Sequence, residues 1–132
     1  MYWDIVTATV ASIVLGFLWY GPFFGKQWMK LMKITPKQMA EGKKKGMPAT
    51  TYLLMIVGAI MTAYVLKLVL LQFPFSAVKS LLLTAVVLWL GFFVPTGIGS
   101  VLWEGRPWKL FFINVGYNLV NLIVMTVVYL LF

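Results

Sequence analysis

Four long apolar segments restrict the fold of this 132-residue chain more than any other feature of its sequence. Each is close to or above the length of about 20 residues that a helix needs to cross the hydrocarbon core of a bilayer. Helices are required there because lipid offers the backbone no hydrogen-bond partner. We therefore predict an all-α integral membrane bundle of four transmembrane helices that forms a single domain over residues 1–132. The predicted spans are residues 3–24, 49–71, 76–103 and 108–132.

The composition agrees with a membrane protein and excludes several functions. Hydrophobic residues make up 62% of the chain and charged residues 11%, whereas a soluble domain has about 45–50% and about 25%. The net charge of +8 is compatible with a nucleic-acid partner, but most of the lysines gather in one segment between apolar runs, so we predict no nucleic-acid binding. Neither Cys nor His occurs, which excludes disulfides, thiol catalysis and thiolate or imidazole metal ligands. We expect no metal and no cofactor.

The distribution of basic residues predicts how the chain is oriented in the membrane. Nine of the eleven Lys and Arg residues lie in the first and third loops between the spans. Basic loops are retained on the cytoplasmic side of a membrane. We therefore place the first and third loops in the cytoplasm and both termini on the extracytoplasmic side. The expected partner of the basic loops is the lipid bilayer, through anionic headgroups.

The first loop contains a segment with the pattern of a helix that lies in the plane of the membrane. If residues 24–33 are helical, lysines occupy one face and apolar side chains the opposite face. The lysines are Lys26, Lys30 and Lys33, and the apolar residues are Phe24, Trp28, Leu31 and Met32. We therefore predict a short amphipathic interfacial helix in the first cytoplasmic loop. It serves either as a dock for anionic lipid or a partner, or as an anchor that fixes the topology.

A second short helix is predicted to follow in the same loop. Thr35 and Gln38 have the spacing of a capping box, in which each side chain accepts a hydrogen bond from the backbone N–H of the other residue. Pro36 stands between them at the first helical position, where its missing N–H is not needed. The pattern predicts that this helix begins at Pro36.

The third loop places Glu104, Gly105, Arg106 and Pro107 just ahead of the last span. Pro107 suits the first position of that helix, so Glu104 lies near the positive end of the helix dipole. Arg106 and Lys109 lie at the end that is unfavourable for cations, and their charges require compensation. Two interpretations are open: contact with lipid headgroups, or an anion site formed with the free amides of the helix start. The candidate residues for either are Lys26, Glu104, Gly105, Arg106 and Lys109.

Three Asn residues lie within the last span. Asn114, Asn118 and Asn121 follow the i, i+4, i+7 spacing and fall on one narrow face of a helix, the Asn stripe. Amide side chains avoid lipid tails, so the stripe is expected to face other helices or another subunit. It either supplies interhelical hydrogen bonds or lines a polar path for a small solute or ion.

The third span supplies a face against which the Asn stripe can pack. Pro95 removes the hydrogen bond to the carbonyl of Gly91, and a kink near Pro95 leaves carbonyls that Thr96 or the stripe can satisfy. Gly91, Gly97 and Gly99 allow a neighbouring helix to approach closely. Pro95 and Thr96 are therefore candidates, with the stripe, for helix packing or for the lining of a path.

The ends of the first and third predicted spans resemble each other. Leu-Trp-Tyr-Gly-Pro ends the first span at residues 18–22, and Leu-Trp-Glu-Gly-Arg-Pro ends the third at residues 102–107. These spans run in the same direction, so a parallel two-plus-two repeat is geometrically allowed. The alternative is chance, because Leu, Trp and Gly are common in such chains.

Several motifs carry a resemblance to a known family. They are Trp-Tyr-Gly-Pro-Phe-Phe-Gly-Lys at residues 19–26 with Trp28, Trp89-Leu-Gly-Phe, Pro95-Thr96, Leu-Trp-Glu-Gly-Arg-Pro-Trp-Lys-Leu-Phe at residues 102–111, and Asn114, Gly116 and Tyr117. On these motifs the chain resembles, over nearly its whole length, the bacterial membrane family catalogued as domain of unknown function 1761. The resemblance implies a small four-span protein of the bacterial inner (cytoplasmic) membrane and supplies no activity.

Two classes of function follow from the sequence. The first is a structural or accessory helical bundle, whose polar residues serve packing and anchoring. The alternative is a small-solute or ion transporter or channel, formed as a homo-oligomer with a path lined by the Asn stripe. Proton-coupled exporters of this size need an acid within the membrane, whereas Asp4 and Glu104 both lie at the ends of spans. We expect no enzymatic activity and no catalytic residue, because no nucleophile and base can be paired.

Overall fold

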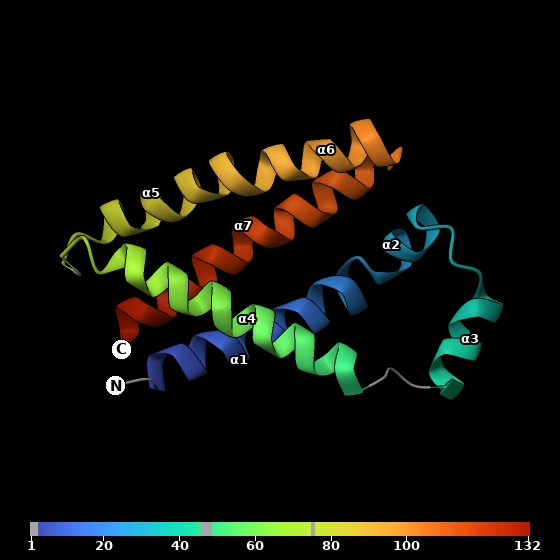
Figure 1. Cartoon of the computed structure of the whole chain (residues 1–132), viewed down its shortest axis with the longest axis horizontal. Helices are drawn as coiled ribbons and strands as arrows, with labels where there is room; N and C mark the ends of the chain where they lie inside the picture. Colours follow the sequence, from blue (N-terminus) through green and yellow to red (C-terminus); the bar gives the residue numbers. More distant parts are fainter. Residues whose placement is uncertain (1–2, 46–48, 75) are drawn as a thin grey trace.

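The four predicted spans are helices in the structure, a computed structural model that describes residues 3–45, 49–74 and 76–132. No strand occurs within these ranges. Each of the four spans is long and apolar enough to cross a membrane, and the chain is therefore an all-α bundle of four transmembrane helices (Figure 1). The spans are Trp3–Phe23, Ala49–Leu70, Val78–Glu104 and Trp108–Leu131, close to the predicted bounds.

Two of the spans contain a short π-helical turn, in which backbone hydrogen bonds skip one residue more than in an α-helix. The first span is α1, Trp3–Leu18, continued by the π-helix η1, Trp19–Phe23. The third span is α5, Val78–Leu88, then η2, Trp89–Phe93, then α6, Val94–Glu104. The lengths of the apolar segments did not predict these turns, because one extra residue in a helical turn changes neither the length nor the composition of a span noticeably.

Helix α7, Trp108–Leu131, is the central element of the bundle. It contacts α1, α5, α6 and also α4, Ala49–Leu70. Figure 1 shows α7 lying between the span formed by α5 and α6 and the helix α1. Within the described residues, α7 contains more buried side chains than any other helix. Residues on α7 are therefore the ones that can contact several spans at once.

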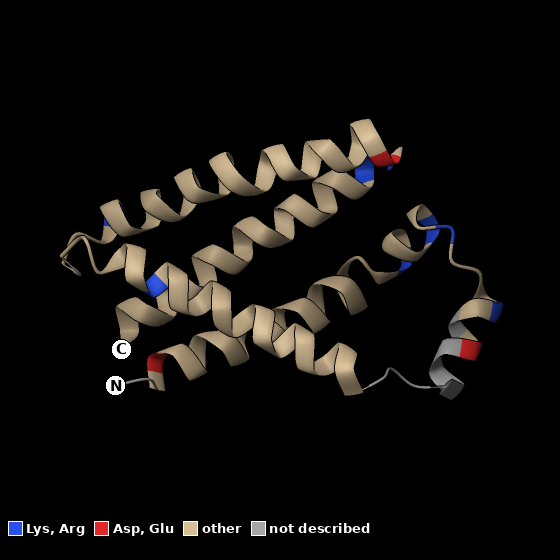
Figure 2. Cartoon of the chain, in the orientation of Figure 1, with Lys and Arg blue, Asp and Glu red and all other residues tan. Residues whose placement is uncertain are grey.

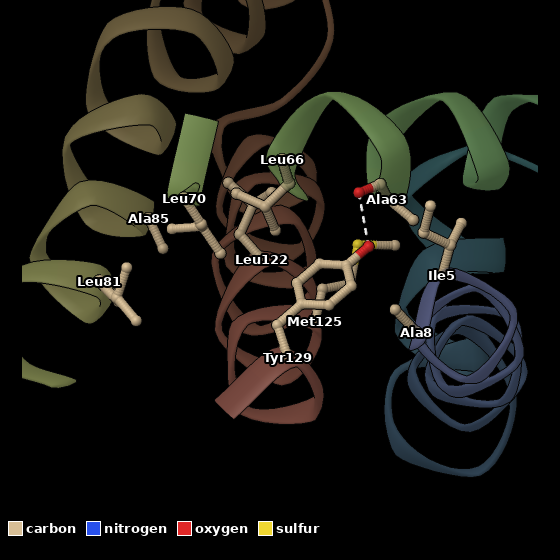
Figure 3. Packing of buried hydrophobic residues seen from close by; sticks show 10 residues of the cluster. All are labelled: Ile5, Ala8, Ala63, Leu66, Leu70, Leu81, Ala85, Leu122, Met125 and Tyr129. Carbon is tan, nitrogen blue, oxygen red and sulfur yellow. Dashed lines mark hydrogen bonds between the residues drawn. The ribbon is translucent and has the colours of Figure 1, made fainter. Parts of the chain in front are cut away.

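The main hydrophobic core, drawn in Figure 3, lies in the half of the bundle that contains the two chain ends (Figure 1). There the hydroxyl of Tyr129 donates a hydrogen bond to the carbonyl oxygen of Ala63 at 2.6 Å. Lipid tails are as apolar as these side chains, so helix association depends on close packing and interhelical hydrogen bonds rather than on burial from water. The core residues are Ile5, Ala8, Ala63, Leu66, Leu70, Leu81, Ala85, Leu122, Met125 and Tyr129.

An ion pair joins α1 to α4 at the same end of the bundle. Lys67 Nζ lies 2.7 Å from Asp4 Oδ2, and the two side chains are only 19% and 18% exposed. The other carboxylate oxygen of Asp4 accepts the N–H of Ile5 at 2.8 Å. Charges that are largely removed from water are tolerated when they are paired and hydrogen-bonded. The sequence placed Asp4 at the end of a span but did not predict its partner.

Two short helices follow in the first loop, α2, Gly25–Leu31, and α3, Pro36–Lys45. Thr35 Oγ1 accepts the N–H of Gln38 at 3.1 Å, and Gln38 Oε1 accepts the N–H of Thr35 at 2.9 Å. The predicted capping box is therefore confirmed. Helix α3 begins at Pro36, as predicted.

Helix α2 ends in a tight turn at Lys33, which adopts the left-handed conformation with φ 59°. The N–H of Ile34 donates to the carbonyl oxygen of Met29 at 2.9 Å, and the N–H of Lys33 donates to the carbonyl oxygen of Lys30 at 3.2 Å. These two bonds form a Schellman motif, whose left-handed position is usually Gly. The helix predicted at residues 24–33 is thus present in a slightly shorter form, while its location in the membrane plane stays a prediction.

Candidate functional site

Two tryptophans, each the first residue of a π-helical turn, donate hydrogen bonds to the backbone of α7. Trp19 Nε1 lies 3.0 Å from the carbonyl oxygen of Ile113, and Trp89 Nε1 lies 2.7 Å from that of Val115. Residues two positions apart on an α-helix point about 200° apart, so the two indoles reach α7 from nearly opposite sides. The first and third spans are thereby joined to the central helix by equivalent bonds.

The two π-helical turns also share a sequence. Leu-Trp-Tyr-Gly-Pro-Phe at residues 18–23 and Leu-Trp-Leu-Gly-Phe-Phe at residues 88–93 have Leu, Trp, Gly and Phe at the same relative positions. The similarity that the sequence suggested at residues 102–107 is at a different place in the structure, because that segment forms the end of α6 and the loop that follows. The spacing Leu-Trp-x-Gly-x-Phe is the signal that could have found the equivalent turns.

Asn114 of the Asn stripe is engaged within the bundle. The hydroxyl of Tyr20, on η1, donates a hydrogen bond to Asn114 Oδ1 at 2.7 Å. The ring centroid of Tyr20 lies 5.3 Å from that of Tyr117 and 6.1 Å from that of Trp28, so aromatic side chains of α7 and α2 surround it. An interhelical bond of this kind contributes about 0.6–2 kcal/mol. At Asn114 the stripe therefore serves to join two spans.

Asn118 and Asn121, unlike Asn114, make no interhelical side-chain bond among the described residues and border a cavity. The cavity lies between α1, α4 and α7 and has a volume of about 580 Å³. No charged side chain is among the described residues that border it. Its polar lining consists of hydroxyl, indole and amide groups, and the remaining lining residues are apolar or Gly. The polar residues are Ser12, Tyr20, Trp28, Thr62, Tyr117, Asn118 and Asn121.

Asn121 is the member of the stripe whose side-chain oxygen is buried without a partner among the described residues. The residue is only 8% exposed, and its Oδ1 has no hydrogen-bond partner among the described residues. A buried acceptor that is left unpaired costs about 1–3 kcal/mol. Packing within this chain therefore does not explain why an Asn, rather than a Leu of similar size, occupies this position.

A second cavity lies on the other side of the stripe, between α6 and α7, with a volume of about 360 Å³. Thr96, Asn114 and Asn118 contribute its polar side chains together with Ser100. Asn118 and Phe93 border both cavities. The three Asn residues therefore have three different surroundings, although helical spacing places them on one face.

Pro95 and Thr96 lie at the start of α6, directly after η2. Thr96 Oγ1 donates a hydrogen bond to the carbonyl oxygen of Phe92 at 2.6 Å. This carbonyl belongs to Phe92, whereas Pro95 removes the hydrogen bond to the carbonyl of Gly91, so the kink near Pro95 and the bonding of its free carbonyls stay a prediction. Pro95 is exposed and is not among the residues that line either cavity.

The third-loop residues have structural roles in the two helices that they connect. Gly105 follows α6 in the left-handed conformation with φ 69°, which favours glycine, and the N–H of Arg106 bonds to the carbonyl of Ser100 at 3.2 Å. Glu104 is the last residue of α6, and its carboxylate lies 3.9 Å from the guanidinium of Arg106 with both side chains substantially exposed. An exposed pair at this distance contributes little stability. Helix α7 begins one residue later than predicted, so Pro107 occupies the N-cap position and not the first helical position.

Two cationic side chains, Lys30 and Lys109, lie at a cavity between α2 and α7. The volume of this cavity is about 490 Å³. Arg106 reaches the end of α2, where its Nη1 lies 2.8 Å from the sulfur of Met32. Lys26 is exposed and does not line this cavity. The structure therefore groups Lys109 with Lys30, a residue of the predicted lysine face that the candidate anion site did not include.

Comparisons with known proteins identify the family of the chain. No curated protein and no solved structure matches it. A family model described as "Protein of unknown function (DUF1761)" matches residues 3–130, which contain both π-helical turns and the whole Asn stripe. The chain therefore belongs to this family, as the motifs that it shares with the family implied.

Proposed function

We propose that this protein is a structural or accessory helical bundle of the inner membrane, without enzymatic activity. The observation that carries the proposal is that polar side chains from all four spans are used to join one span to another. Such bonds contribute about 0.6–2 kcal/mol each in membrane bundles. They are the hydrogen bonds of Trp19, Trp89, Tyr20 and Tyr129 and the ion pair of Asp4 with Lys67.

The positions of the acidic residues support this proposal over proton-coupled transport. Pumps and exporters of that kind use a titratable group within the membrane. The chain contains three acidic residues. Asp4 is paired with Lys67, Glu41 lies in the loop helix α3, and Glu104 is the last residue of α6. None of them lies in the middle of a span.

The proposed location has both termini outside and the basic loops against the cytoplasmic leaflet. Figure 2 shows that the described Lys and Arg residues of α2, of the start of α3 and of the α6–α7 connection lie at the end of the molecule away from the two termini. Positive side chains close to a membrane surface attract anionic headgroups. The cavity bordered by Lys30 and Lys109 supports headgroup contact at this end.

The alternative function is a homo-oligomeric transporter or channel with a path along the Asn stripe. The cavities on both sides of Asn118 favour it, whereas the bond between Tyr20 and Asn114 favours packing. Thiol accessibility tests the two functions cleanly because the chain contains no Cys. A single cysteine at Asn114 is expected to react slowly with a water-soluble thiol reagent, and Asn114→Leu is expected to lower thermal stability.

The contrary result is equally specific. Fast modification of cysteines at Asn114, Asn118 and Asn121 alike, with unchanged stability of Asn114→Leu, would replace the accessory role by a solute path. Solute flux into proteoliposomes, measured for the unmodified protein and for Asn118→Leu, would then identify what passes. No flux above that of empty vesicles is expected for an accessory bundle.

A further inference from the structure

The cavity between α1, α4 and α7 contains a polar group that the fold itself does not use. Asn121 borders this cavity, is 8% exposed, and has an Oδ1 atom without a hydrogen-bond donor among the described residues. An amide carries both an acceptor oxygen and a donor NH₂ group, so it can complete its bonding only with a partner that reaches it. In this rotamer Oδ1 has almost no accessible surface, so a molecule in the cavity reaches it only after a half-turn of the amide about χ2, which exchanges the oxygen and the nitrogen.

The walls of the cavity restrict the chemistry of that partner. Ser12 and Thr62 contribute hydroxyl groups from α1 and α4, and Thr62 already donates to the carbonyl of Gly58 at 3.0 Å. Tyr117 donates to the carbonyl of Ser12 at 3.4 Å, which is long for a hydroxyl donor and leaves this group able to change partner. With no charged residue in the described lining, the site does not compensate a charged ligand.

The volume is also that of a small-molecule site. About 580 Å³ falls within the range of roughly 300–1,000 Å³ that is common for ligand cavities, which are mostly apolar with a few placed polar groups. We propose that this cavity binds a small neutral molecule with an apolar body and one hydrogen-bond donor, and that the amide of Asn121 rotates so that its oxygen accepts that donor. This inference goes beyond the accessory role, because a bundle that only joins its spans needs no such site.

Fluorescence quenching by a brominated probe tests the proposal. Trp28 borders the cavity, whereas Trp103 does not and is 88% exposed. 4-Bromophenol, which has the required donor, is titrated into the protein in phosphatidylcholine nanodiscs. We expect a saturable component of quenching that disappears in Trp28→Phe and persists in Trp103→Phe. 4-Bromoanisole has the same bromophenyl ring with a methoxy group in place of the hydroxyl donor and should bind about tenfold more weakly.

Two kinds of variant assign the binding to the cavity. Asn121→Leu removes the acceptor and should weaken 4-bromophenol about tenfold while leaving 4-bromoanisole unchanged. Gly58→Phe fills the cavity from α4, where a Cβ meets no atom within 4 Å, and should abolish saturable quenching. Gly91→Phe is the matched control, because a Cβ there also meets nothing within 4 Å and the residue does not line the cavity.

The outcomes separate a ligand site from an ordinary void. Equal binding of the two probes, or unchanged quenching in Gly58→Phe, would show partition into lipid and would overturn the proposal. Absence of any saturable component would overturn it as well and would leave water or acyl chains as the occupants. None of these results alters the bonds between spans, so the accessory role is tested separately by the stability of Asn114→Leu.

Discussion

A close approach between α6 and α7 depends on a single glycine, Gly97 on α6. A Cβ added at this position would lie 2.8 Å from Val115 Cγ1 and 3.0 Å from Phe111 Cε2. Carbon atoms prefer separations of about 3.5–4.0 Å, so the methyl group of Gly97→Ala would overlap its neighbours by roughly 0.5–1 Å. Val115 and Phe111 are both buried on α7, and both also border the cavity between α6 and α7. The substitution therefore forces these side chains to shift toward that cavity or α6 to move away from α7.

The expected cost follows from this overlap. Adding a methyl group to a well-packed interior lowers the free energy of unfolding by about 1–3 kcal/mol. Gly91→Ala makes the same chemical change where a Cβ meets no atom within 4 Å, so it corrects for the greater helix propensity of Ala. We expect Gly97→Ala to be about 1–3 kcal/mol less stable than Gly91→Ala. The measurement is unfolding in mixed micelles with increasing dodecyl sulfate, followed by far-UV circular dichroism.

A second substitution checks the cause. Val115→Ala removes the methyl group that the new Cβ would meet first, so it should restore part of the stability lost in Gly97→Ala. The recovery is expected to be incomplete because Phe111 stays in place at 3.0 Å. Equal stability of Gly97→Ala and Gly91→Ala, or purely additive losses in the double variant, would refute the argument that α6 and α7 are in limiting contact here.

Three further predictions concern the bonds to α7 and the orientation. Trp89→Phe removes the indole donor to the Val115 carbonyl and should lower the free energy of unfolding by about 1 kcal/mol in the same assay; no change would mean that this bond does not stabilise the bundle. Tyr20→Phe and Asn114→Leu should each destabilise, with a coupling energy of about 0.6–2 kcal/mol in the double variant, whereas additive effects would contradict the hydrogen bond between them. An impermeant thiol reagent applied to intact cells should label a cysteine that replaces Gln72 but not one that replaces Glu104, because basic loops are retained in the cytoplasm. The opposite labelling would reverse the orientation.

The sequence by itself determined the features that depend on neighbours along the chain. The four spans follow from apolar length, because a bilayer fixes how many residues a helix must have and leaves the backbone no alternative to helical hydrogen bonding. The capping box of Thr35 and Gln38 follows in the same way, since both partners lie within one turn and need no other part of the fold. Helical spacing also placed Asn114, Asn118 and Asn121 on one face of α7.

Only the tertiary structure decided what each of those Asn residues does. Asn114 meets Tyr20, Asn118 lies between two cavities, and Asn121 is buried beside a cavity without a partner. The partners and cavity walls come from other spans, and the residue that faces a given amide depends on how the helices cross and on the extra residue in each π-helical turn. The same holds for the ion pair of Asp4 with Lys67. A pattern along one helix specifies which side chains share a face, but the atoms opposite that face are set by contacts between segments far apart in the chain.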